Sequence, residues 1–318
     1  MNSELARAHK ATNALHTCVL LGAMGIVFLL LGYLLGGVRG AALVSGAGLF
    51  LLWFSPRIAP SVIMRLYGAR SLQRGEISRI HEMVDLLARR ASLSRVPRLY
   101  YVPTRLMNAF TVGDRENSAI GLTDGLLRAL NLRELAGVLA HEVSHVRNND
   151  MRVMTLADVV SRVASTFQTV ALFSVAFMSL AGARIPWLVL FGLLATPTVL
   201  ALLQLALSRT REFDADVGAL ELTGDAVGLA SALGKMERYQ QRFLDRILAT
   251  GRHVPAPSIL RSHPNTEERI RRLAELAEAP PSVPRDADPT VFDGAFTVPD
   301  ALTLIDRAPR WHVSGLWY

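Results

Sequence analysis

The chain has 318 residues, of which 51% are hydrophobic, and its formal net charge is +7. This apolar composition directs attention to membrane segments, and membrane proteins often carry an excess of Arg and Lys in their cytoplasmic parts. The basic residues form no patch with interleaved aromatic residues, so we expect no nucleic-acid partner. The single cysteine, Cys18, excludes an internal disulfide bond and a cysteine-based metal site.

Four uncharged apolar runs divide the chain, at residues 17–35, 41–54, 163–183 and 185–207. A helix rises about 1.5 Å per residue, so about 20 residues cross a hydrocarbon core of roughly 30 Å. The second run is short by this measure, and a cleaved signal peptide is the alternative for the N-terminus. A buried soluble hairpin is the alternative for the last two runs. We expect an integral membrane protein with about four transmembrane helices in the lipid bilayer.

The distribution of charge predicts the topology. Arg and Lys are dense before residue 17, after residue 54 and around residue 210, whereas each turn between paired runs carries a single arginine. By the positive-inside rule, the N-terminus and the soluble segments 57–152 and 208–318 face the cytoplasm of a multi-pass protein of the cell (inner) membrane. Because a hairpin separates these two segments, they share one side of the membrane and can form a single domain.

Between the apolar runs, the pattern of hydrophobic residues predicts helices and short strands. Residues 75–92 place their apolar positions on one side of a helix. Three β-like stretches follow, at 98–102, 109–112 and 118–122. Asn131 and Glu134 match a capping box, which predicts a helix from Leu132 to about Asn148. The predicted fold class is therefore mostly α with a small β-sheet.

The predicted helix contains His141-Glu142-Val143-Ser144-His145. Residues four apart lie on the same helical face, so His141 and His145 can bind one zinc ion. Glu142 can then reach a water molecule at that ion and act as the general base of peptide hydrolysis. The alternative is a helix whose histidines cap a core or face solvent.

Catalytic zinc sites have three protein ligands and one open position, so a third ligand is needed. Glu212 follows the fourth apolar run, on the same side of the membrane, and is expected to begin a helix. Asp216 lies one turn further on the same face and could hold a ligand histidine through a hydrogen bond. Spacing favours Glu212 but leaves Asp150, Asp214 and Glu221 as competing carboxylates. A third histidine at metzincin spacing is absent from the sequence.

From about residue 20 to residue 275, the chain resembles the HtpX-type membrane metalloproteases, which are relatives of the CAAX prenyl endopeptidases. The resemblance is carried by motifs in the family's order: Asn108-Ala109-Phe110, Ala140-His141-Glu142-Val143-Ser144-His145 with Asp150 after it, a hydrophobic hairpin, Ser208-Arg209-Thr210-Arg211-Glu212-Phe213-Asp214-Ala215-Asp216, and His263-Pro264-Asn265-Thr266-Glu267-Glu268-Arg269-Ile270. It implies a zincin-like catalytic domain with one zinc ion per chain on His141, His145 and Glu212, and Glu142 as general base.

The resemblance also concerns substrate binding. It implies that Asn108, Ala109 and Phe110 lie on an edge strand and line the cleft, where a substrate chain could add as a further strand. Without the resemblance, these residues would be taken for an ordinary strand. The role of His263 stays open between stabilising the oxyanion and bracing the fold.

Together these observations divide the chain into five expected segments: an N-terminal transmembrane hairpin (1–56), a first part of the catalytic domain (57–162), a second transmembrane hairpin (163–207), a second part of the catalytic domain (208–278) and a C-terminal extension of unknown role (279–318). The expected function is zinc-dependent endopeptidase activity on the cytoplasmic side, with misfolded membrane proteins as substrates and a role in stress response.

A prenyl-protein endopeptidase is one alternative, although four apolar runs are few for the chamber of those relatives. A membrane scaffold with a structural metal site is the other. The sequence gives no oligomeric state.

Overall fold

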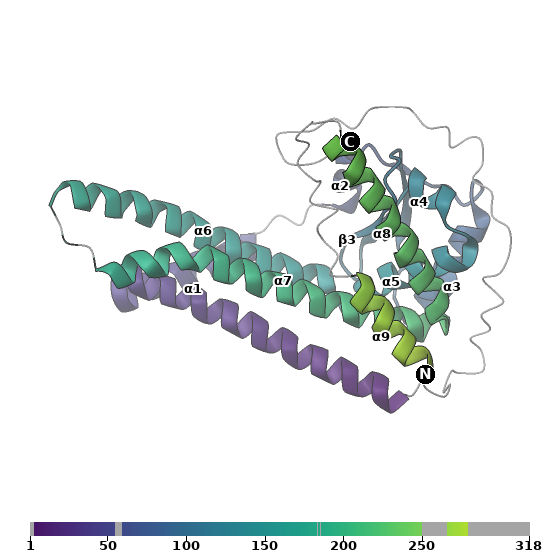
Figure 1. Ribbon diagram of the computed structural model, residues 1–318, viewed down its shortest axis with the longest axis horizontal. Helices are drawn as coiled ribbons and strands as arrows, with labels where there is room; N and C mark the ends of the chain where they lie inside the picture. The colour runs from purple at the N-terminus through teal and green to yellow at the C-terminus, as the bar shows by residue number, and fades with distance from the viewer. Residues whose placement is uncertain (1–2, 55–58, 183, 185, 250–265, 279–318) are drawn as a thin grey trace. The chain divides into compact units, whose positions relative to one another are not determined.

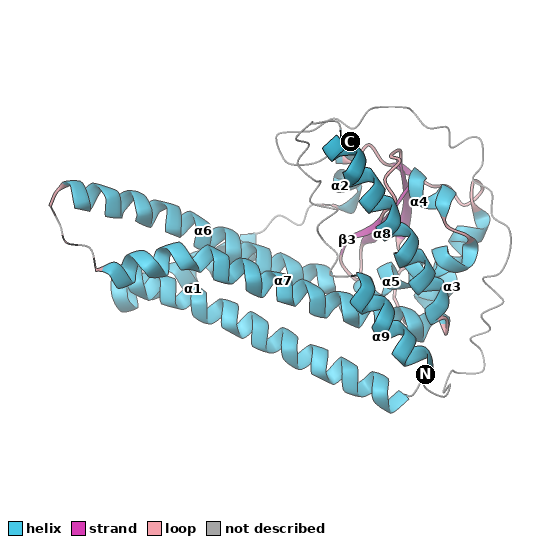
Figure 2. Cartoon of the chain, viewed as in Figure 1, coloured by secondary structure: helices cyan, strands magenta, loops and turns pink. Residues whose placement is uncertain are grey.

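The computed structural model describes residues 3–54, 59–182, 184, 186–249 and 266–278. The chain forms two compact units. The mixed unit comprises Met1–Lys10, Ile58–Met151 and Glu212–Tyr318, and the helical unit comprises Ala11–Arg57 and Arg152–Arg211. Figure 2 shows that helices dominate both units and that the strands lie in the mixed unit. His263 and the C-terminal extension 279–318 lie outside the described residues.

The described part of the helical unit consists of most of α1 (Ser3–Phe54), α6 (Asp150–Leu180) and α7 (Trp187–Thr223) (Figure 1). Helix α1 is broken at Gly36 and Gly37, where the backbone leaves helical geometry. Across this break the two arms fold onto each other, because a Cβ added at Gly32 would lie 2.9 Å from the Cα of Ala41. Residues 17–35 and 41–54 therefore form the predicted hairpin. Helices α6 and α7 lie side by side, and Ser161 donates a hydrogen bond to Gln204 between them.

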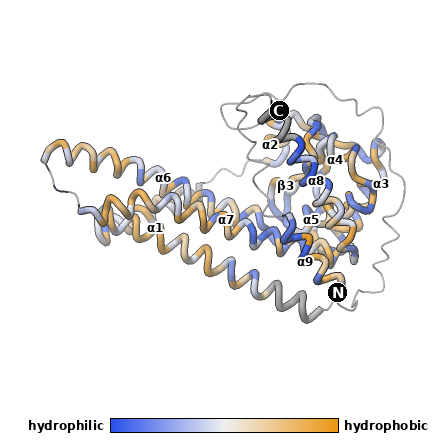
Figure 3. The backbone as a smooth tube through the Cα atoms, viewed as in Figure 1, coloured by the Kyte–Doolittle hydropathy of each residue, from blue (hydrophilic) through white to orange (hydrophobic). Residues whose placement is uncertain are grey.

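Among the residues that the structure describes, three segments are long and apolar enough to cross a membrane: Ala11–Leu34, Asp150–Leu180 and Trp187–Thr223. In Figure 3 these helices are largely apolar along the helical unit. Large apolar side chains are exposed there, including Phe173 at 73% and Phe177 at 74%. Such exposure is unfavourable in water and suits contact with lipid. Residues 41–54 are not among the three segments because this arm is short, so the fourth span stays a prediction.

A four-stranded sheet forms one layer of the mixed unit. Its strands are β1 (Arg70–Ser71), β2 (Arg98–Val102), β3 (Ala109–Gly113) and β4 (Ser118–Thr123), in the spatial order β1-β2-β4-β3. Strands β2 and β4 are parallel, and the other two pairs are antiparallel. The strands expected at 98–102, 109–112 and 118–122 are confirmed within one residue at their ends. Strand β1 was not predicted, because two exposed residues give no periodicity. Strand β3 lies at one edge of the sheet.

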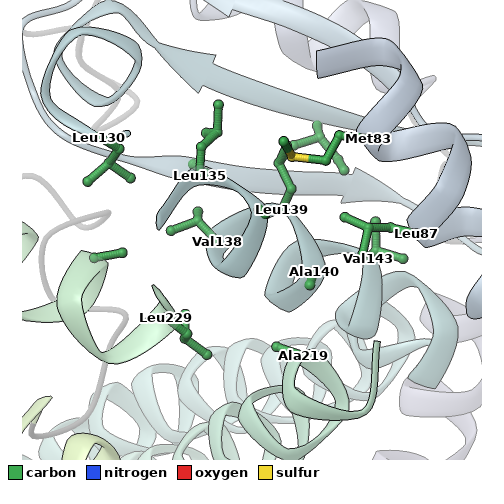
Figure 4. Packing of buried hydrophobic residues seen from close by; sticks show 14 of the residues in the cluster. Met83, Leu87, Leu130, Leu135, Val138, Leu139, Ala140, Val143, Ala219 and Leu229 are labelled. Atoms are coloured by element: carbon green, nitrogen blue, oxygen red, sulfur yellow. The ribbon is translucent and has the colours of Figure 1, made fainter. Parts of the chain in front are cut away.

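The described helices of the mixed unit are α2 (Pro60–Leu66), α3 (Ser78–Arg90), α4 (Asp124–Ala129), α5 (Leu132–Asn148), α8 (Ala226–Ala249) and α9 (Thr266–Glu278), together with the end of α7. Helix α5 packs against α3, α8 and strand β3. Figure 4 shows α5 at the centre of the core, with Leu135 and Leu139 on the side of α3 and the sheet, and Leu229 of α8 beneath it. At Gly137, a Cβ would lie 2.8 Å from the backbone of Leu229, so a glycine is needed for this close helix packing.

One expectation about the metal-ligand helix is wrong. Glu212 was expected to begin a helix, but it lies well inside α7, which continues from the apolar segment to Thr223. The chain between residues 208 and 211 contains no glycine or proline, so nothing breaks the helix where the apolar run ends. The same helix therefore carries the apolar segment and the carboxylates Glu212 and Asp216.

Candidate metal-dependent active site

Helix α5 presents the two histidines of the predicted motif. Its N-terminus is closed by a capping box: Asn131 Oδ1 accepts a hydrogen bond from the Glu134 amide at 2.9 Å, and Glu134 Oε2 accepts one from the Asn131 amide at 3.0 Å. Such a cap satisfies amides that the helix leaves unpaired. One turn separates His141 and His145 on the same face, and both side chains are buried.

A third side chain completes a group that can hold one metal ion. The Nε2 atoms of His141 and His145 are 3.1 Å apart. Glu212 brings Oε2 to 3.3 Å from His141 Nε2 and Oε1 to 3.8 Å from His145 Nε2. Metal bonds of about 2.0–2.1 Å at tetrahedral angles separate neighbouring ligand atoms by about 3.3 Å. Two imidazoles and one carboxylate at these separations therefore fit a single ion.

Asp150 orients His145 from behind. Asn149 ends α5 in the left-handed conformation (φ 59°, ψ 34°), and α6 begins at the next residue. This sharp turn brings the fully buried Asp150 back to the site, with Oδ2 at 2.8 Å from His145 Nδ1. A carboxylate on Nδ1 holds the proton there and leaves Nε2 free to bind a metal.

Asp216 and Arg269 contact the other two side chains of this group, His141 and Glu212. Asp216 Oδ1 lies 3.0 Å from His141 Nδ1. Arg269 of α9, with 1% of its surface exposed, donates to both oxygens of Asp216 at 2.6 and 2.7 Å, and its Nη1 lies 3.0 Å from Glu212 Oε2. A bidentate guanidinium–carboxylate pair has a fixed geometry. Helix α9 thus fixes the orientation of both carboxylates on α7.

Glu142, the expected general base, is held by the edge strand. Thr111 of β3 donates a hydrogen bond to Glu142 Oε2 at 2.7 Å, and both side chains are buried. Glu142 also lines a cavity together with His141 and Arg269. Its carboxylate is therefore oriented beside the histidines and has access to a space in which a reactant can lie.

The site concentrates negative charge in a buried region. Burial on its own would lower the pKa of His141, but hydrogen bonds with Asp216 and Glu212 outweigh that effect and raise its pKa to about 10. The buried carboxylates near the two histidines are Glu142, Asp150, Glu212 and Asp216. Such a cluster attracts a divalent cation more strongly than an exposed one would, because water screens it less.

Sequence comparisons identify the family. Residues 75–277 match Peptidase family M48. The chain belongs to peptidase family M48. Protease HtpX homologs from Sulfurihydrogenibium sp. and Methylibium petroleiphilum are 33% identical over 293 residues and 32% identical over 279 residues. Each alignment covers 83% of this chain, and 96% and 98% of the two relatives. The crystal structure of S. mikatae Ste24p superposes with a TM-score of 0.47 at 22% identity, over 84% of this chain and 66% of that chain.

Membership of M48 confirms the predicted family and the predicted enzyme class. The chain is a membrane metalloendopeptidase with protein or peptide substrates, since the family match, the relatives and three apolar helices agree. Its metal ion has a fitting donor set in His141, His145 and Glu212.

Each of the three competing carboxylates contacts a side chain of α5. Asp214 accepts a hydrogen bond from the Asn148 amide side chain at 3.2 Å, and Glu221 pairs with Arg147 at 2.9 Å. Asp150 contacts Nδ1 of His145, on the side of the ring away from the Nε2 atom that faces His141. Spacing alone had left all three open as ligands.

The three residues expected to bind substrate are placed differently from one another. Asn108 immediately precedes β3, and its carbonyl accepts a hydrogen bond from the Thr123 amide at 3.1 Å. Ala109 lines the cavity beside His141 and Glu142. The ring of Phe110 points to the opposite face of the sheet, where it contacts Tyr67 at 4.9 Å between ring centroids. Side chains alternate across a strand, so Ala109 and Phe110 cannot face the same side.

The sequence reasoning missed two residues that contact the site. In the sequence, Arg269 is visible only as a member of the last family motif, and Thr111 only as a member of a predicted strand. Only the three-dimensional structure shows that Arg269 is 1% exposed and lies among carboxylates. The same holds for the Thr111 hydroxyl, which lies 2.7 Å from the Glu142 carboxylate. The sequence held one indirect signal for Arg269, which is its place in the last motif of the family resemblance, six residues after His263.

Proposed function

We propose that the chain is a zinc-dependent endopeptidase of the cell (inner) membrane, with zinc on His141, His145 and Glu212 and with Glu142 as general base. One observation carries the proposal. The Nε2 atoms of His141 and His145 and the carboxylate of Glu212 lie within 3.8 Å of one another. A second carboxylate, that of Glu142, lines a cavity with His141 and is not a member of this group. Zinc is supported by the donor set, since two histidines and one glutamate are typical of catalytic zinc sites with an open fourth position.

A bound zinc ion supplies Lewis acidity, which makes a water molecule more acidic and polarises the scissile carbonyl. The protein contributes the proton transfers. Glu142 accepts the proton of the attacking water and later delivers it to the leaving amine. Thr111 keeps the Glu142 carboxylate in the orientation needed for both steps. Asp150 and Asp216 keep the two histidines in the tautomer that binds metal.

The edge strand β3 is proposed to bind the substrate backbone. The Asn108 carbonyl accepts a hydrogen bond from the Thr123 amide of β4. In an antiparallel pair, hydrogen-bonded and non-hydrogen-bonded residues alternate along each strand. The amide and carbonyl groups of Ala109 and Thr111 therefore point away from β4. An extended substrate chain can pair with them whatever its sequence, as in other cases of strand addition. The substrate backbone would then pair with the segment Asn108–Phe110. Of these three residues, Ala109 lines the same cavity as Glu142.

The cytoplasmic orientation of the mixed unit is supported by the positive-inside rule. Arg and Lys flank the apolar segments on the side of the mixed unit, whereas each turn between paired runs carries one arginine. The proposed substrates are misfolded membrane proteins, because the helix that carries Glu212 also contains an apolar segment that can cross the membrane. The proposed role is membrane-protein quality control in the response to stress.

The proposal is tested with the full-length chain purified in detergent and supplied with zinc. Casein and an unfolded membrane protein are incubated with the wild type and with Glu142→Gln, which keeps the side-chain size but removes the base. We expect cleavage by the wild type and a rate at least about 100-fold lower for the variant, in the range typical of general-base removal. Equal cleavage by both proteins would show that the proposed mechanism is wrong.

A further inference from the structure

A second cavity of the mixed unit shares no lining residue with the cavity beside Glu142. Its volume is about 640 Å³, which lies within the range of about 300–1,000 Å³ that is typical of small-ligand sites. Most of its lining residues are polar or charged: Ser61, Arg95, Arg98, Glu116, Asn117 and Ser118. We call this cavity the arginine pocket. The peptide hydrolysis proposed above uses none of its residues.

Strand pairing and helix packing hold the walls of the arginine pocket together. Arg98 begins β2 and lies opposite Ala119 of the parallel strand β4, one residue after Ser118. Ser118 begins β4 and pairs with Gly113 at the end of β3. A Cβ added at Gly113 would lie 2.7 Å from Cγ of Pro60, so the start of α2 packs against the same end of this strand pair. The pocket therefore joins three segments that are separate in the sequence.

The turn between β3 and β4 presents hydrogen-bond donors in a fixed arrangement. Asp114 Oδ1 accepts hydrogen bonds from the amides of Glu116 and Asn117 at 3.1 and 2.9 Å, which fixes the turn. Arg98 Nη2 donates to Asn117 Oδ1 at 2.7 Å. Because the oxygen of the Asn117 side chain makes this bond, its NH₂ group remains available as a donor to a ligand. Arg98 keeps further N–H donors of its own for the same ligand.

Two further donors line the pocket without a partner of their own. Ser118 is 6% exposed, and its hydroxyl makes no hydrogen bond with any residue that the structure describes. The large majority of buried polar side chains are hydrogen-bonded, so a buried hydroxyl in a cavity wall points to an oxygen atom of a bound molecule. Arg95 is exposed, and within the described part of the chain its guanidinium has no hydrogen bond or ion pair. Both donors can therefore bind oxygen atoms of an anion.

The charges of the arginine pocket favour a singly charged phosphate group. Guanidinium groups bind phosphate oxygens through two parallel hydrogen bonds, and Arg95 and Arg98 supply two such groups. Glu116 lines the same pocket, so its carboxylate offsets one of the two positive charges. A phosphate monoester carries a charge of about −1.5 to −2 at neutral pH, whereas a phosphodiester carries a single negative charge. The remaining positive charge therefore matches a phosphodiester best.

The position of the pocket in the chain favours the lipid bilayer as the source of this phosphodiester. Ala59, which also lines the pocket, follows the apolar arm 41–54 of α1 by five residues. Anionic lipids attract arginines that lie close to the membrane surface. We propose that the arginine pocket binds the phosphodiester group of an anionic membrane lipid, such as phosphatidylglycerol, through Arg95, Arg98 and Ser118. This lipid site is independent of the proposed peptide hydrolysis.

The test measures lipid binding to the full-length chain in detergent by native mass spectrometry. Phosphatidylglycerol or phosphatidylcholine is titrated, and the dissociation constant of the first bound lipid is determined for the wild type, Arg95→Gln and Ser118→Ala. We expect phosphatidylglycerol to bind about tenfold more weakly to Arg95→Gln, which loses hydrogen bonds between charged groups, and about fivefold more weakly to Ser118→Ala. Binding of phosphatidylcholine should be unchanged in both variants, because its headgroup has no net charge.

Arg79→Gln is the matched control, because Arg79 of α3 is an exposed arginine outside the pocket. This control changes the net charge by the same amount as Arg95→Gln. A general attraction of the basic chain to anionic lipid would therefore weaken equally in both variants, whereas a specific site is lost only in Arg95→Gln. Both arginines are exposed, so this comparison decides the question even if Ser118→Ala fails to fold.

A second arm distinguishes a lipid from a soluble phosphate. The Tm of each protein in lipid-free detergent is measured with and without inorganic phosphate, since a ligand of the folded state raises Tm. Weaker phosphatidylglycerol binding by Arg95→Gln than by Arg79→Gln supports the proposal. Equal binding by the two variants overturns it: the pocket then takes soluble phosphate if phosphate raises the Tm of the wild type but not of Arg95→Gln, and binds neither ligand if phosphate has no effect. Glu142→Gln should bind phosphatidylglycerol as the wild type does, so the result does not depend on the peptidase mechanism.

Discussion

The carboxylate behind His145 makes the orientation of the metal ligands testable. Asp150 is fully buried, and its Oδ2 lies 2.8 Å from His145 Nδ1. In Asp150→Asn the shape of the side chain is kept, but the imidazole loses the anion that stabilises a proton on Nδ1. Loss of such a partner lowers metal affinity about 10–100-fold, which corresponds to about 1.4–2.8 kcal/mol. We expect a decrease of this size in the zinc affinity of the full-length protein.

The affinity is measured in detergent by competition with a chromogenic zinc chelator. Asp85→Asn is the matched control, because Asp85 on α3 also pairs with an arginine, Arg74, at 2.7 Å, but makes no contact with the site. The control should bind zinc as the wild type does. If Asp150→Asn keeps its fold and also binds zinc with wild-type affinity, the argument that Asp150 orients His145 is refuted.

Three further predictions follow from contacts around the site. Thr111→Val loses a hydrogen bond to the Glu142 carboxylate, worth about 1.5–3 kcal/mol, so we expect kcat about 10–100-fold lower with KM little changed; Thr111→Ser should restore most of it. Gly137→Ala forces a Cβ to 2.8 Å from the backbone of Leu229, and overpacking should outweigh the gain in helix propensity by about 1 kcal/mol net, which a lower Tm in detergent would reveal. Burial raises the pKa of Glu134, but hydrogen bonds from a lysine and a serine of α8 outweigh this and lower it. The stabilisation is therefore present above about pH 4.3 and lost as the pH falls through the folded-state pKa; Glu134→Gln should show a weaker acid dependence of Tm than the wild type.

The parts of the fold that could be predicted are those set by neighbours in sequence. The capping box at Asn131 and Glu134 and the bounds of α5 are confirmed, because helix capping depends on residues three apart. The hairpin in α1 was likewise predicted from two apolar runs with a short turn between them. The end of the last apolar run was not a helix boundary, because hydrophobicity ends at residue 207 but no glycine or proline interrupts the helix between there and Glu212.

The rest of the site depends on contacts that sequence spacing does not encode. Arg269 reaches His141 across 128 residues, and Thr111 reaches Glu142 across 31 residues. The contact of Asp150 with His145 was not predicted, since the position of Asp150 depends on a single left-handed residue, Asn149. Spacing favoured Glu212 over its rivals, and the family resemblance strengthened that choice, because spacing alone cannot show which carboxylate faces α5.

The central claim is that one zinc ion is held by His141, His145 and Glu212, while Glu142 acts only on the reactants. It is tested most directly by the bound zinc per chain, measured by mass spectrometry of the metal after dialysis, in Glu212→Gln and Glu142→Gln. The account predicts that Glu142→Gln retains one zinc per chain, as the wild type does, and that Glu212→Gln loses most of it. Full retention of zinc by Glu212→Gln would contradict the account.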